Sequence, residues 1–574
     1  MELDQYQKKA YLTKEKKVLV VAPPGSGKTT VMLKRLSHIL EEGIPGDQVV
    51  VLTFSKASAV EMEQRFVHTS KNKPFFGTIH GLCYKILRER QGKLDMIFGK
   101  EEFLIRNRMQ RELKIDQTDV DSLFRDISKY KVHTYLDEGT ITLTHRDELF
   151  KKAYDLYEEE RIKKGLLDFD DLQIEVLKEF SKPEVLEEFK KKHTHILIDE
   201  FQDLDPIQLK LIQKISQDQL LFCVGDEDQC IYAFRGSDPK GMIDFETMFK
   251  GKKLYLKYNY RSTENIVNYA GDVISKNALR NDKELLASRK EQRKIIKIFP
   301  ENQEMMLYDM AKEISKDDFK SYAILYRTNR EGLRVKEYLR KEKISFHSRD
   351  NFNFFKGFIA KDVLDYIRVV YQDDRQAFLR IANKPYRYIS KDDLRKIGLG
   401  EDISKVLLEP KKNRYALDNN RSFLKDLSLM KKTNMNKLVS YIEKVLGYED
   451  YLISYADRTG RDEDELFEDL REMEEVASYY DNPLELLIAS SIDPDEKEAK
   501  VTLSTVHGVK GLEFDKVFVI NAVEGYMPHA ASMEDLEEER RIFYVAITRA
   551  REELNIYSPR FIHGKERKRS RFIL

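Results

Sequence analysis

A glycine-rich stretch follows the apolar run Lys17 to Val21 and leads into a predicted helix. In this context backbone N–H groups and a helix N-terminus converge on an anion, and Gly25 and Gly27 let the backbone close around phosphates. We expect Lys28 to supply a positive charge to the β- and γ-phosphates and Thr29 to offer its hydroxyl group to Mg²⁺. The predicted nucleotide-binding residues of this loop are Ala22, which replaces the usual first glycine, Pro23, Pro24, Gly25, Ser26, Gly27, Lys28, Thr29 and Thr30.

Two adjacent carboxylates follow a second apolar run, His195 to Ile198. Asp199 can hold Mg²⁺, and Glu200 can polarise a water molecule that attacks the γ-phosphate. A pair of acids after a strand is common in loops, so this interpretation depends on the phosphate loop. Together the two segments predict an enzyme that hydrolyses a nucleoside triphosphate with the help of Mg²⁺; they fit any P-loop NTPase, so the function must come from other segments.

The elements that must position these residues are two sets of short apolar runs, each followed by a helical stretch. Because the runs are continuous rather than alternating, we interpret them as buried strands of two parallel sheets. The first set is Lys17 to Val21, Val49 to Thr53, His195 to Ile198 and Leu220 to Val224; the second set is Tyr322 to Tyr326, Val501 to Ser504 and Lys516 to Ile520. Long charged stretches at 89–165 and about 386–495 have helical spacing and predict mostly helical insertions.

Composition limits the remaining possibilities. The chain has 574 residues, which predicts about three to four folding units, and its 100 basic and 100 acidic residues balance. A neutral average leaves nucleic-acid binding open, because binding needs only a local basic groove. No apolar stretch is long enough for a membrane span, and the N-terminus lacks a signal sequence, so we expect no membrane association and a cytoplasmic protein. Cys83, Cys223 and Cys230 are expected to be free thiols.

A series of further motifs identifies the class of ATPase. They are TFSKA from Thr53, GTIHGL from Gly77, VGDEDQCIYAFRG from Val224, NYRS from Asn259, TVHGVKGLEF from Thr505 and EEERRIFYVAITRA from Glu537. In this order the chain resembles the superfamily 1 helicases, most of all the branch that contains UvrD, PcrA and Rep. The resemblance runs from about residue 3 to residue 550 and so covers nearly the whole chain.

The resemblance implies an α/β fold with two RecA-like P-loop NTPase domains, each with a parallel sheet and a mostly helical insertion. In this 1A/1B/2A/2B layout we expect domain 1A at 1–88 and 166–275, insertion 1B at 89–165, domain 2A at 276–385 and 496–574, and insertion 2B at 386–495.

The resemblance also assigns residues to the nucleotide. Gln7 is expected to read the adenine edge and Tyr260 to stack on the adenine ring. Arg261 and Arg549 are expected to reach the γ-phosphate from the two sides of a cleft. Two more nucleotide contacts are implied: Gln229, which senses the γ-phosphate, and Glu513, from the second sheet. With Lys28, Asp199 and Glu200, the residues Gln229, Arg261 and Arg549 make up the predicted catalytic set.

Single-stranded DNA and junctions of single- and double-stranded DNA are the implied partners. Aromatic side chains that stack on bases tolerate any sequence, which suits a motor that must pass every base. Phe234 stands where many relatives have Trp. The implied DNA contacts are Thr53, Phe54, His80, Tyr232, Phe234, Arg235 and His507.

Several properties stay open at the level of sequence. The second insertion looks short, and in the family this region contacts duplex DNA or partner proteins. The chain ends soon after the last motif, so we expect no C-terminal segment for docking on RNA polymerase and no fused nuclease. Movement from 3′ to 5′ follows from the branch alone. Alternatives to a helicase in DNA repair, replication restart or recombination are an ATPase that only remodels protein–DNA complexes and a defence-system subunit; RNA is an alternative substrate.

Overall fold

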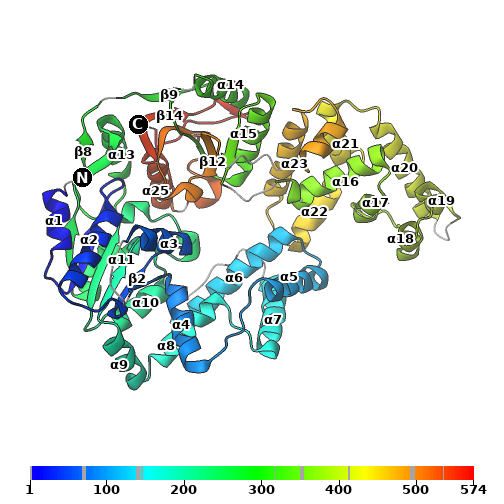
Figure 1. Cartoon of the computed structure of the whole chain (residues 1–574). Coiled ribbons are helices and arrows are strands. Elements are labelled where there is room, and N and C mark those ends of the chain that lie inside the picture. Colours follow the sequence, from blue (N-terminus) through cyan, green and yellow to red (C-terminus); the bar gives the residue numbers. More distant parts are fainter. Residues whose placement is uncertain are drawn as a thin grey trace.

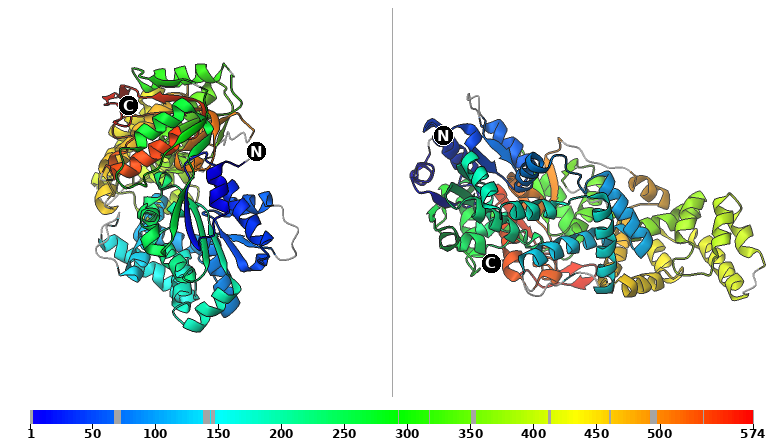
Figure 2. Two further views of the ribbon diagram at one scale, coloured as in Figure 1. Left: turned by 90° about the vertical axis from the view of Figure 1, so that its left-hand side faces the viewer. Right: turned by 90° about the horizontal axis from the view of Figure 1, so that it is seen from below.

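Two α/β bodies and two helical bodies make up the computed structural model of the chain (Figure 1). The structure describes residues 3–66, 73–137, 143, 147–291, 293–316, 318–349, 354–410, 414–459, 461–491, 498–533 and 535–573. The two α/β bodies lie one above the other, and the helical bodies extend from them to one side (Figure 2). This arrangement confirms the predicted α/β class with two parallel sheets and helical insertions.

The first α/β body is built on a parallel sheet with the strand order β3-β2-β4-β5-β1-β6. Its strands are rich in Val, Ile and Leu because helices cover both faces of the sheet. The strands are β1 Lys17–Val21, β2 Val49–Leu52, β3 Phe75–Gly77, β4 His195–Ile198, β5 Leu220–Gly225 and β6 Lys252–Tyr255. The helices are α1 Gln5–Tyr11, α2 Lys28–Glu41, α3 Lys56–Arg65, α4 Ile79–Gln91, α8 Phe169–Glu179, α9 Pro183–Lys192, α10 Pro206–Ile215, α11 Lys240–Ile243 and α12 Phe245–Phe249.

The second α/β body repeats this plan with the parallel order β11-β12-β10-β13-β14-β9. Its strands are β9 Ile295–Ile298, β10 Tyr322–Tyr326, β11 Phe346–Ser348, β12 Val501–Thr505, β13 Phe514–Val519 and β14 Ala550–Tyr557. The helices are α13 Glu264–Ile274, α14 Gln303–Ile314, α15 Asn329–Lys341 and α25 Leu536–Ile547. Two small sheets accompany them: β7 Tyr258–Thr263 with β8 Leu286–Arg289, and β15 Phe561–Ile562 with β16 Lys565–Glu566.

The position of α13 shifts the boundary between the two α/β bodies. Ile266 and Val273 of α13 are buried in one apolar core with Phe543 of α25 and Val517 of β13. The helix therefore belongs to the second body, because its apolar face is covered there. The predicted boundary between residues 275 and 276 places it in the first.

The first helical body lies between α4 and α8. It consists of α5 Lys100–Leu113, α6 Gln117–Leu136 and α7 Asp147–Lys164. These helices share a small core of their own, which includes Ile105, Leu123 and Tyr157. An independent core is what allows such a segment to be inserted into an α/β body without disturbing the sheet.

The second helical body is larger, and it begins earlier in the chain than residue 386. Phe354 and the buried face of α16 share one core with the helices that follow, so α16 and α17 belong to this body. Its helices are α16 Phe358–Gln372, α17 Arg375–Ile381, α18 Lys391–Gly398, α19 Ile403–Leu408, α20 Arg414–Met430, α21 Leu438–Lys444, α22 Tyr448–Thr459, α23 Glu463–Ala477 and α24 Pro483–Ala489.

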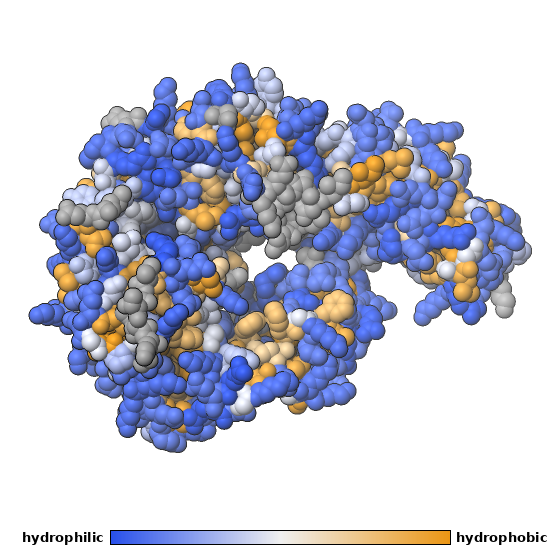
Figure 3. Space-filling model, viewed as in Figure 1, coloured by the Kyte–Doolittle hydropathy of each residue, from blue (hydrophilic) through white to orange (hydrophobic). Residues whose placement is uncertain are grey.

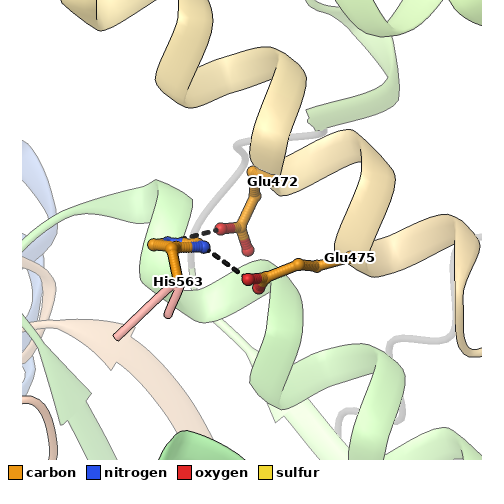
Figure 4. Close-up of side chains that lie close together, drawn as sticks. All are labelled: Glu472, Glu475 and His563. Atoms are coloured by element: carbon orange, nitrogen blue, oxygen red, sulfur yellow. Dashed lines mark hydrogen bonds and ion pairs between the residues drawn. The ribbon is translucent and has the colours of Figure 1, made fainter. Parts of the chain in front are cut away.

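Charged side chains join the second helical body to the second α/β body. Arg330 of α15 lies 2.9 Å from Glu468 and 2.8 Å from Asp469 of α23. His563 lies 2.6 Å from Glu475 and 3.5 Å from Glu472. Figure 4 shows how both carboxylates face the imidazole ring. A cavity of about 670 Å³ lies along this joint between α15 and α23.

The two helical bodies also contact each other, far from the sheets. The Tyr455 hydroxyl of α22 bonds the Asp119 carboxylate and accepts the Asp116 amide N–H at 3.2 Å. Arg458 donates to the Lys114 carbonyl oxygen. Within the second helical body, the Phe358 ring supports Tyr455 by stacking on it with 4.7 Å between centroids. With this contact the four bodies surround an opening that is visible in the middle of the molecule (Figure 3).

Two smaller expectations can be compared with the structure. The three cysteines, Cys83, Cys223 and Cys230, are buried free thiols, as predicted. In the ranges described above, no helix combines the length and apolar character that a membrane span requires.

Candidate functional site

The phosphate loop lies between β1 and α2, and its glycines have conformations that other residues rarely adopt. Gly25 has φ 71° and Gly27 has φ 83°. A Cβ atom on Gly25 would lie 2.7 Å from Cβ of Arg261, and one on Gly27 would lie 2.8 Å from Nε2 of Gln7. Both positions therefore require glycine, because of the backbone conformation and because of the close neighbours. Helix α2 begins at Lys28, so its free N–H groups face the loop.

The predicted acid pair lies next to this loop. Nζ of Lys28 is 3.1 Å from Oε2 of Glu200, which also accepts a hydrogen bond from Gln202 at 2.5 Å. Burial alone would raise the pKa of Glu200, but Lys28 and Lys510 outweigh burial and lower it to about 2. Burial and the charge of Glu200 raise the pKa of Asp199 to about 7.

These groups fit a nucleoside triphosphate with Mg²⁺. The left-handed glycines let the loop backbone curve as a phosphate cradle requires, and the charge of Lys28 suits phosphate oxygens. The Asp199 carboxylate is buried, and Mg²⁺ prefers carboxylate and hydroxyl oxygens such as those of Asp199 and Thr29. A buried carboxylate with a raised pKa is one that a bound cation would keep ionised.

Gln7 and Tyr260 border the same loop from two other elements. Nε2 of Gln7 donates to the Ser26 carbonyl oxygen at 2.9 Å, and Oε1 of Gln7 accepts the amide of Asp4 at 3.1 Å in a capping box of α1. The backbone N–H of Tyr260 donates to the Gly25 carbonyl oxygen at 2.9 Å, and its hydroxyl bonds Asp4 at 2.5 Å. The structure thus brings both predicted adenine contacts, Gln7 and Tyr260, to the edge of the phosphate loop.

The two predicted arginines lie where the α/β bodies meet. Nε of Arg261 is 2.6 Å from Oε2 of Glu513, and its Nη1 donates to the Thr548 carbonyl oxygen at 3.1 Å. Arg549 is only 1% exposed, and burial together with the like charge of Arg261 lowers its pKa to about 9. Nη2 of Arg549 donates to Oε1 of Gln229 at 3.3 Å. The glutamine, both arginines and Glu513 therefore lie in one cleft.

Lys510, Asp203 and Asn259 also hold this cleft together, although the sequence analysis gave them no role. Nζ of Lys510 lies 2.5 Å from Oδ2 of Asp203 and donates to the Gln229 carbonyl oxygen at 2.8 Å, which ties the second body to the first. Asn259 donates to the Pro24 carbonyl oxygen at 2.8 Å and accepts the Arg261 amide. Lys510 and Asn259 belong to motifs quoted above, and Asp203 follows the acid pair by three positions, so closeness to a motif was the available signal.

Four of the predicted DNA contacts form one aromatic cluster. The rings of Phe54 and Tyr232 stack with 4.8 Å between centroids and 17° between planes. Phe234 is 47% exposed, and its ring lies 5.8 Å from Tyr232 and 5.7 Å from His507. We call Phe54, Tyr232, Phe234 and His507 the aromatic cluster. An exposed ring beside stacked rings is a suitable platform for bases.

The other three predicted contacts are placed differently. Thr53 is buried, and its hydroxyl donates to the Ser55 carbonyl oxygen at 2.9 Å, so the side chain supports the loop from inside. His80 lies edge-on to Phe169 with 5.5 Å between centroids and 3.1 Å from Nε2 of Gln173. The side chain of Arg235 lies outside the described part of the structure.

One short segment connects the nucleotide cleft, which contains Gln229, Arg261, Glu513 and Arg549, with the aromatic cluster. Gln229 and Tyr232 stand three positions apart after β5. Lys510 and His507, also three positions apart, contact this segment from the second body. Lys510 donates to the Gln229 carbonyl oxygen, and Nε2 of His507 lies 3.1 Å from the Ile231 carbonyl oxygen. The second body therefore contacts this segment next to both sites.

Comparison with known proteins identifies the family of the chain. Residues 3–250 match the UvrD/REP helicase N-terminal domain, and residues 254–559 match the UvrD-like helicase C-terminal domain. The chain is 33% identical to YjcD of Bacillus subtilis, with all of this chain and 80% of that protein covered. It is 30% and 28% identical to the ATP-dependent DNA helicases PcrA of Bacillus subtilis and Staphylococcus aureus, with 96% of this chain and 82% of each relative covered. The chain therefore belongs to the UvrD/REP helicase family.

Proposed function

We propose that the chain is an ATP-dependent DNA helicase that moves along single-stranded DNA from 3′ to 5′ and separates duplex strands. The observation that carries the proposal is the cleft between the α/β bodies, in which Arg549 of one body meets Gln229 of the other. Activity on ATP and DNA is supported by the names of the PcrA relatives. DNA repair, replication restart or recombination is the process in which we expect it to act.

In the proposed reaction, the loop and Lys28 bind the triphosphate. Thr29 and Asp199 would hold Mg²⁺, which would supply positive charge for the β- and γ-phosphates. Glu200 is ionised over the whole neutral range because its pKa lies at about 2, so it can accept a hydrogen bond from the attacking water and orient it. Arg261 and Arg549 stabilise the charge that develops on the γ-phosphate in the transition state.

Movement follows if hydrolysis changes the distance between the two bodies. The arginines act on the γ-phosphate only while the cleft is closed, so ATP favours closure and its hydrolysis releases it. Because Lys510 and His507 hold the segment from Gln229 to Tyr232, closure and opening also shift the aromatic cluster. Alternating closure and opening then moves the DNA stepwise, provided the two bodies hold it with different strength in each state.

A second candidate is an ATPase that remodels protein–DNA complexes, alone or as a defence-system subunit, without unwinding DNA by itself. It is favoured by exposed rings on the second helical body, where Tyr386 and Tyr388 lie 4.7 Å apart and Tyr388 and Tyr415 lie 5.4 Å apart. Exposed apolar groups that gather on a surface often mark a protein contact.

One set of assays separates these candidates. ATP turnover is measured without nucleic acid, with single-stranded DNA and with single-stranded RNA, beside displacement of a labelled strand from duplexes with a 3′ or a 5′ DNA overhang. A helicase of the proposed polarity shows DNA-stimulated turnover and displaces the strand only beside the 3′ overhang. Stimulated turnover without displacement supports the second candidate. Displacement from the 5′ overhang alone refutes the proposed direction, and stimulation by RNA alone refutes the substrate.

A further inference from the structure

We infer that Lys283 is a positioning residue that orients the Gln229 amide in the nucleotide cleft by holding Asp226. The inference rests on the proposed role of Gln229 toward the γ-phosphate, and it adds a residue to which neither the motifs nor the family resemblance gave a role. Lys283 lies on the segment between α13 and β8, 57 positions after Asp226.

Three consecutive carboxylates are buried directly in front of Gln229. Asp226, Glu227 and Asp228 follow β5, and their residues are fully buried. Several buried negative charges in one place are costly unless cations are close to them. Such a set of oxygen atoms could also hold a metal ion. The turn is therefore either a metal site or a site that a cationic side chain of the protein neutralises.

Lys283 supplies that charge. Its side chain is only 3% exposed, and its Nζ bonds Asp226 and lies 3.0 Å from Glu227 and 2.8 Å from Asp228. Burial lowers the pKa of Lys283, but the three carboxylates outweigh burial, so that the pKa lies well above its ordinary value. Arg280, three positions earlier, lies 2.9 Å from Asp228 and adds a second positive charge. The chain itself thus fills the place of a metal ion.

The contact with Asp226 fixes which way the Gln229 amide points. Nε2 of Gln229 donates to Oδ2 of Asp226 at 2.7 Å, while Lys283 binds Oδ1 of the same carboxylate. An ionised carboxylate only accepts hydrogen bonds, so the amide must present its NH₂ group to Asp226 and its oxygen to the cleft. That oxygen accepts the hydrogen bond from Arg549. Without Lys283 the buried Asp226 would take up a proton or move, and the amide could rotate.

The segment that carries Lys283 also contacts the second α/β body. The Ala278 amide donates to Oε1 of Glu537 at 2.6 Å, and Asn277 donates to the Glu537 carbonyl oxygen at 3.0 Å. Glu537 stands in the first turn of α25, the helix that ends just before Arg549. The segment that carries Lys283 is thus bonded to α25, and Arg549, the hydrogen-bond partner of Gln229, stands just after that helix. Lys283 and Arg549 therefore hold Gln229 from connected parts of the structure.

The test is steady-state ATP turnover, with single-stranded DNA present, by the full chain carrying Lys283→Met. This change removes the ammonium group and keeps the stem. Because misplaced reacting groups cost up to about 100-fold, kcat is expected to fall by about 10- to 100-fold while KM for ATP changes little. Lys283→Arg keeps the charge and should recover part of kcat. Lys516→Met is the matched control, since Lys516 is equally buried, 2.9 Å from Glu313 and 2.7 Å from Glu553, and should change only stability.

A double-mutant cycle with Gln229→Ala shows whether Lys283 acts through the glutamine. If it does, Gln229→Ala with Lys283→Met is no slower than Gln229→Ala alone. Effects that multiply, or an unchanged kcat in folded Lys283→Met, overturn the inference and leave the proposed function intact. An unchanged kcat in Gln229→Ala refutes the role proposed for Gln229 itself. If Lys283→Met does not fold, Asp226→Asn tests the same link, because it keeps the shape and removes one charge; an unchanged kcat in that variant also overturns the inference.

Discussion

Arg549 and Gln229 are 320 positions apart in the chain, yet Nη2 of the arginine donates a hydrogen bond to Oε1 of the glutamine at 3.3 Å. One residue follows α25 of the second α/β body, and the other lies in the turn after β5 of the first. A guanidinium group that is fully buried, with a pKa lowered to about 9, is costly to keep in place. Because Arg549 lies next to the proposed γ-phosphate sensor, we attribute this costly burial to a role in the nucleotide cleft.

Arg549→Ala should therefore slow hydrolysis much more than it weakens ATP binding. Loss of a preorganised donor to the transition state costs about 100-fold or more in kcat, whereas the loop and Lys28 still bind the ground state. Single-turnover hydrolysis and the Kd of an ATP analogue are measured together. Arg560→Ala is the control, because Arg560 is exposed and pairs with Glu301 and Glu566, which are not part of the cleft. Equal losses of binding and turnover would show that Arg549 is a ground-state ligand.

Lys28→Ala should abolish ATP turnover and leave binding of single-stranded DNA largely intact. Lys28 is the cation of the phosphate loop and pairs with Glu200, whereas the aromatic cluster is formed by other residues. Turnover and the Kd for a fluorescent oligonucleotide are compared with those of Lys34→Ala, an exposed lysine on the same helix. Retained turnover in Lys28→Ala would refute the assignment of the phosphate site.

Asp199→Asn should raise the Mg²⁺ concentration that is needed for half-maximal turnover. The substitution removes a charged oxygen ligand but keeps the side-chain volume. Because burial disfavours the Asp199 charge in the protein without a cation, the melting temperature of the metal-free variant should equal or exceed that of the parent chain. Turnover is titrated with Mg²⁺ in both proteins. An unchanged Mg²⁺ dependence would exclude Asp199 as a ligand.

Phe234→Ala should raise the Kd for single-stranded DNA by roughly 5- to 150-fold, the equivalent of about 1–3 kcal/mol for one stacked base. Phe234→Trp should bind at least as tightly as the parent chain, since the larger ring keeps the stacking surface. Phe299→Ala is the control, because Phe299 is also exposed but belongs to the second α/β body next to Arg569. Equal affinities of the Phe234→Ala and Phe299→Ala variants would exclude Phe234 as a base contact.

Tyr455→Phe should loosen the contact between the two helical bodies. The hydroxyl bonds Asp119 and the Asp116 amide, and loss of a partner for such buried groups costs about 1–3 kcal/mol. Hydrogen exchange of backbone amides around residues 114–119 should become faster, while exchange in β1 and β10 stays the same. Tyr451→Phe, on the same helix, is the control. Unchanged exchange at 114–119 would mean that this hydroxyl does not hold the two bodies together.

Much of the fold follows from the sequence because each predicted strand is a continuous apolar run. The run Lys17 to Val21 is β1 without any shift of its ends, and Tyr322 to Tyr326 is β10. Strands such as β3, Phe75–Gly77, and β11, Phe346–Ser348, were not predicted, because three residues give too little periodicity. The boundaries of domains were the weakest predictions. Whether α13 and α16 belong to one body or the next depends on which core covers their apolar faces.

Some residues of the site could also be predicted from the sequence, and others could not. Lys28 and Glu200 could be predicted because each lies in a recognisable motif that begins where a strand ends. Lys510 lay inside a quoted motif, but its partner Asp203 is 307 positions away, so only the structure pairs them. Lys283 gave no local signal at all, since it is one charged residue in a charged segment. Its role depends on three carboxylates that the fold brings to it.

The ion pairs between α15 and α23 have a consequence for the conditions in which the enzyme works. Arg330 is paired with Glu468 and Asp469 at the boundary of the second helical body, where water and dissolved ions have access. At a physiological salt concentration, charges separated by more than about 8 Å in water are largely screened, and partly exposed pairs weaken as salt is added. The rigidity of the joint between the second helical body and the second α/β body therefore depends on the salt concentration of the solution, and it should decrease as ionic strength increases.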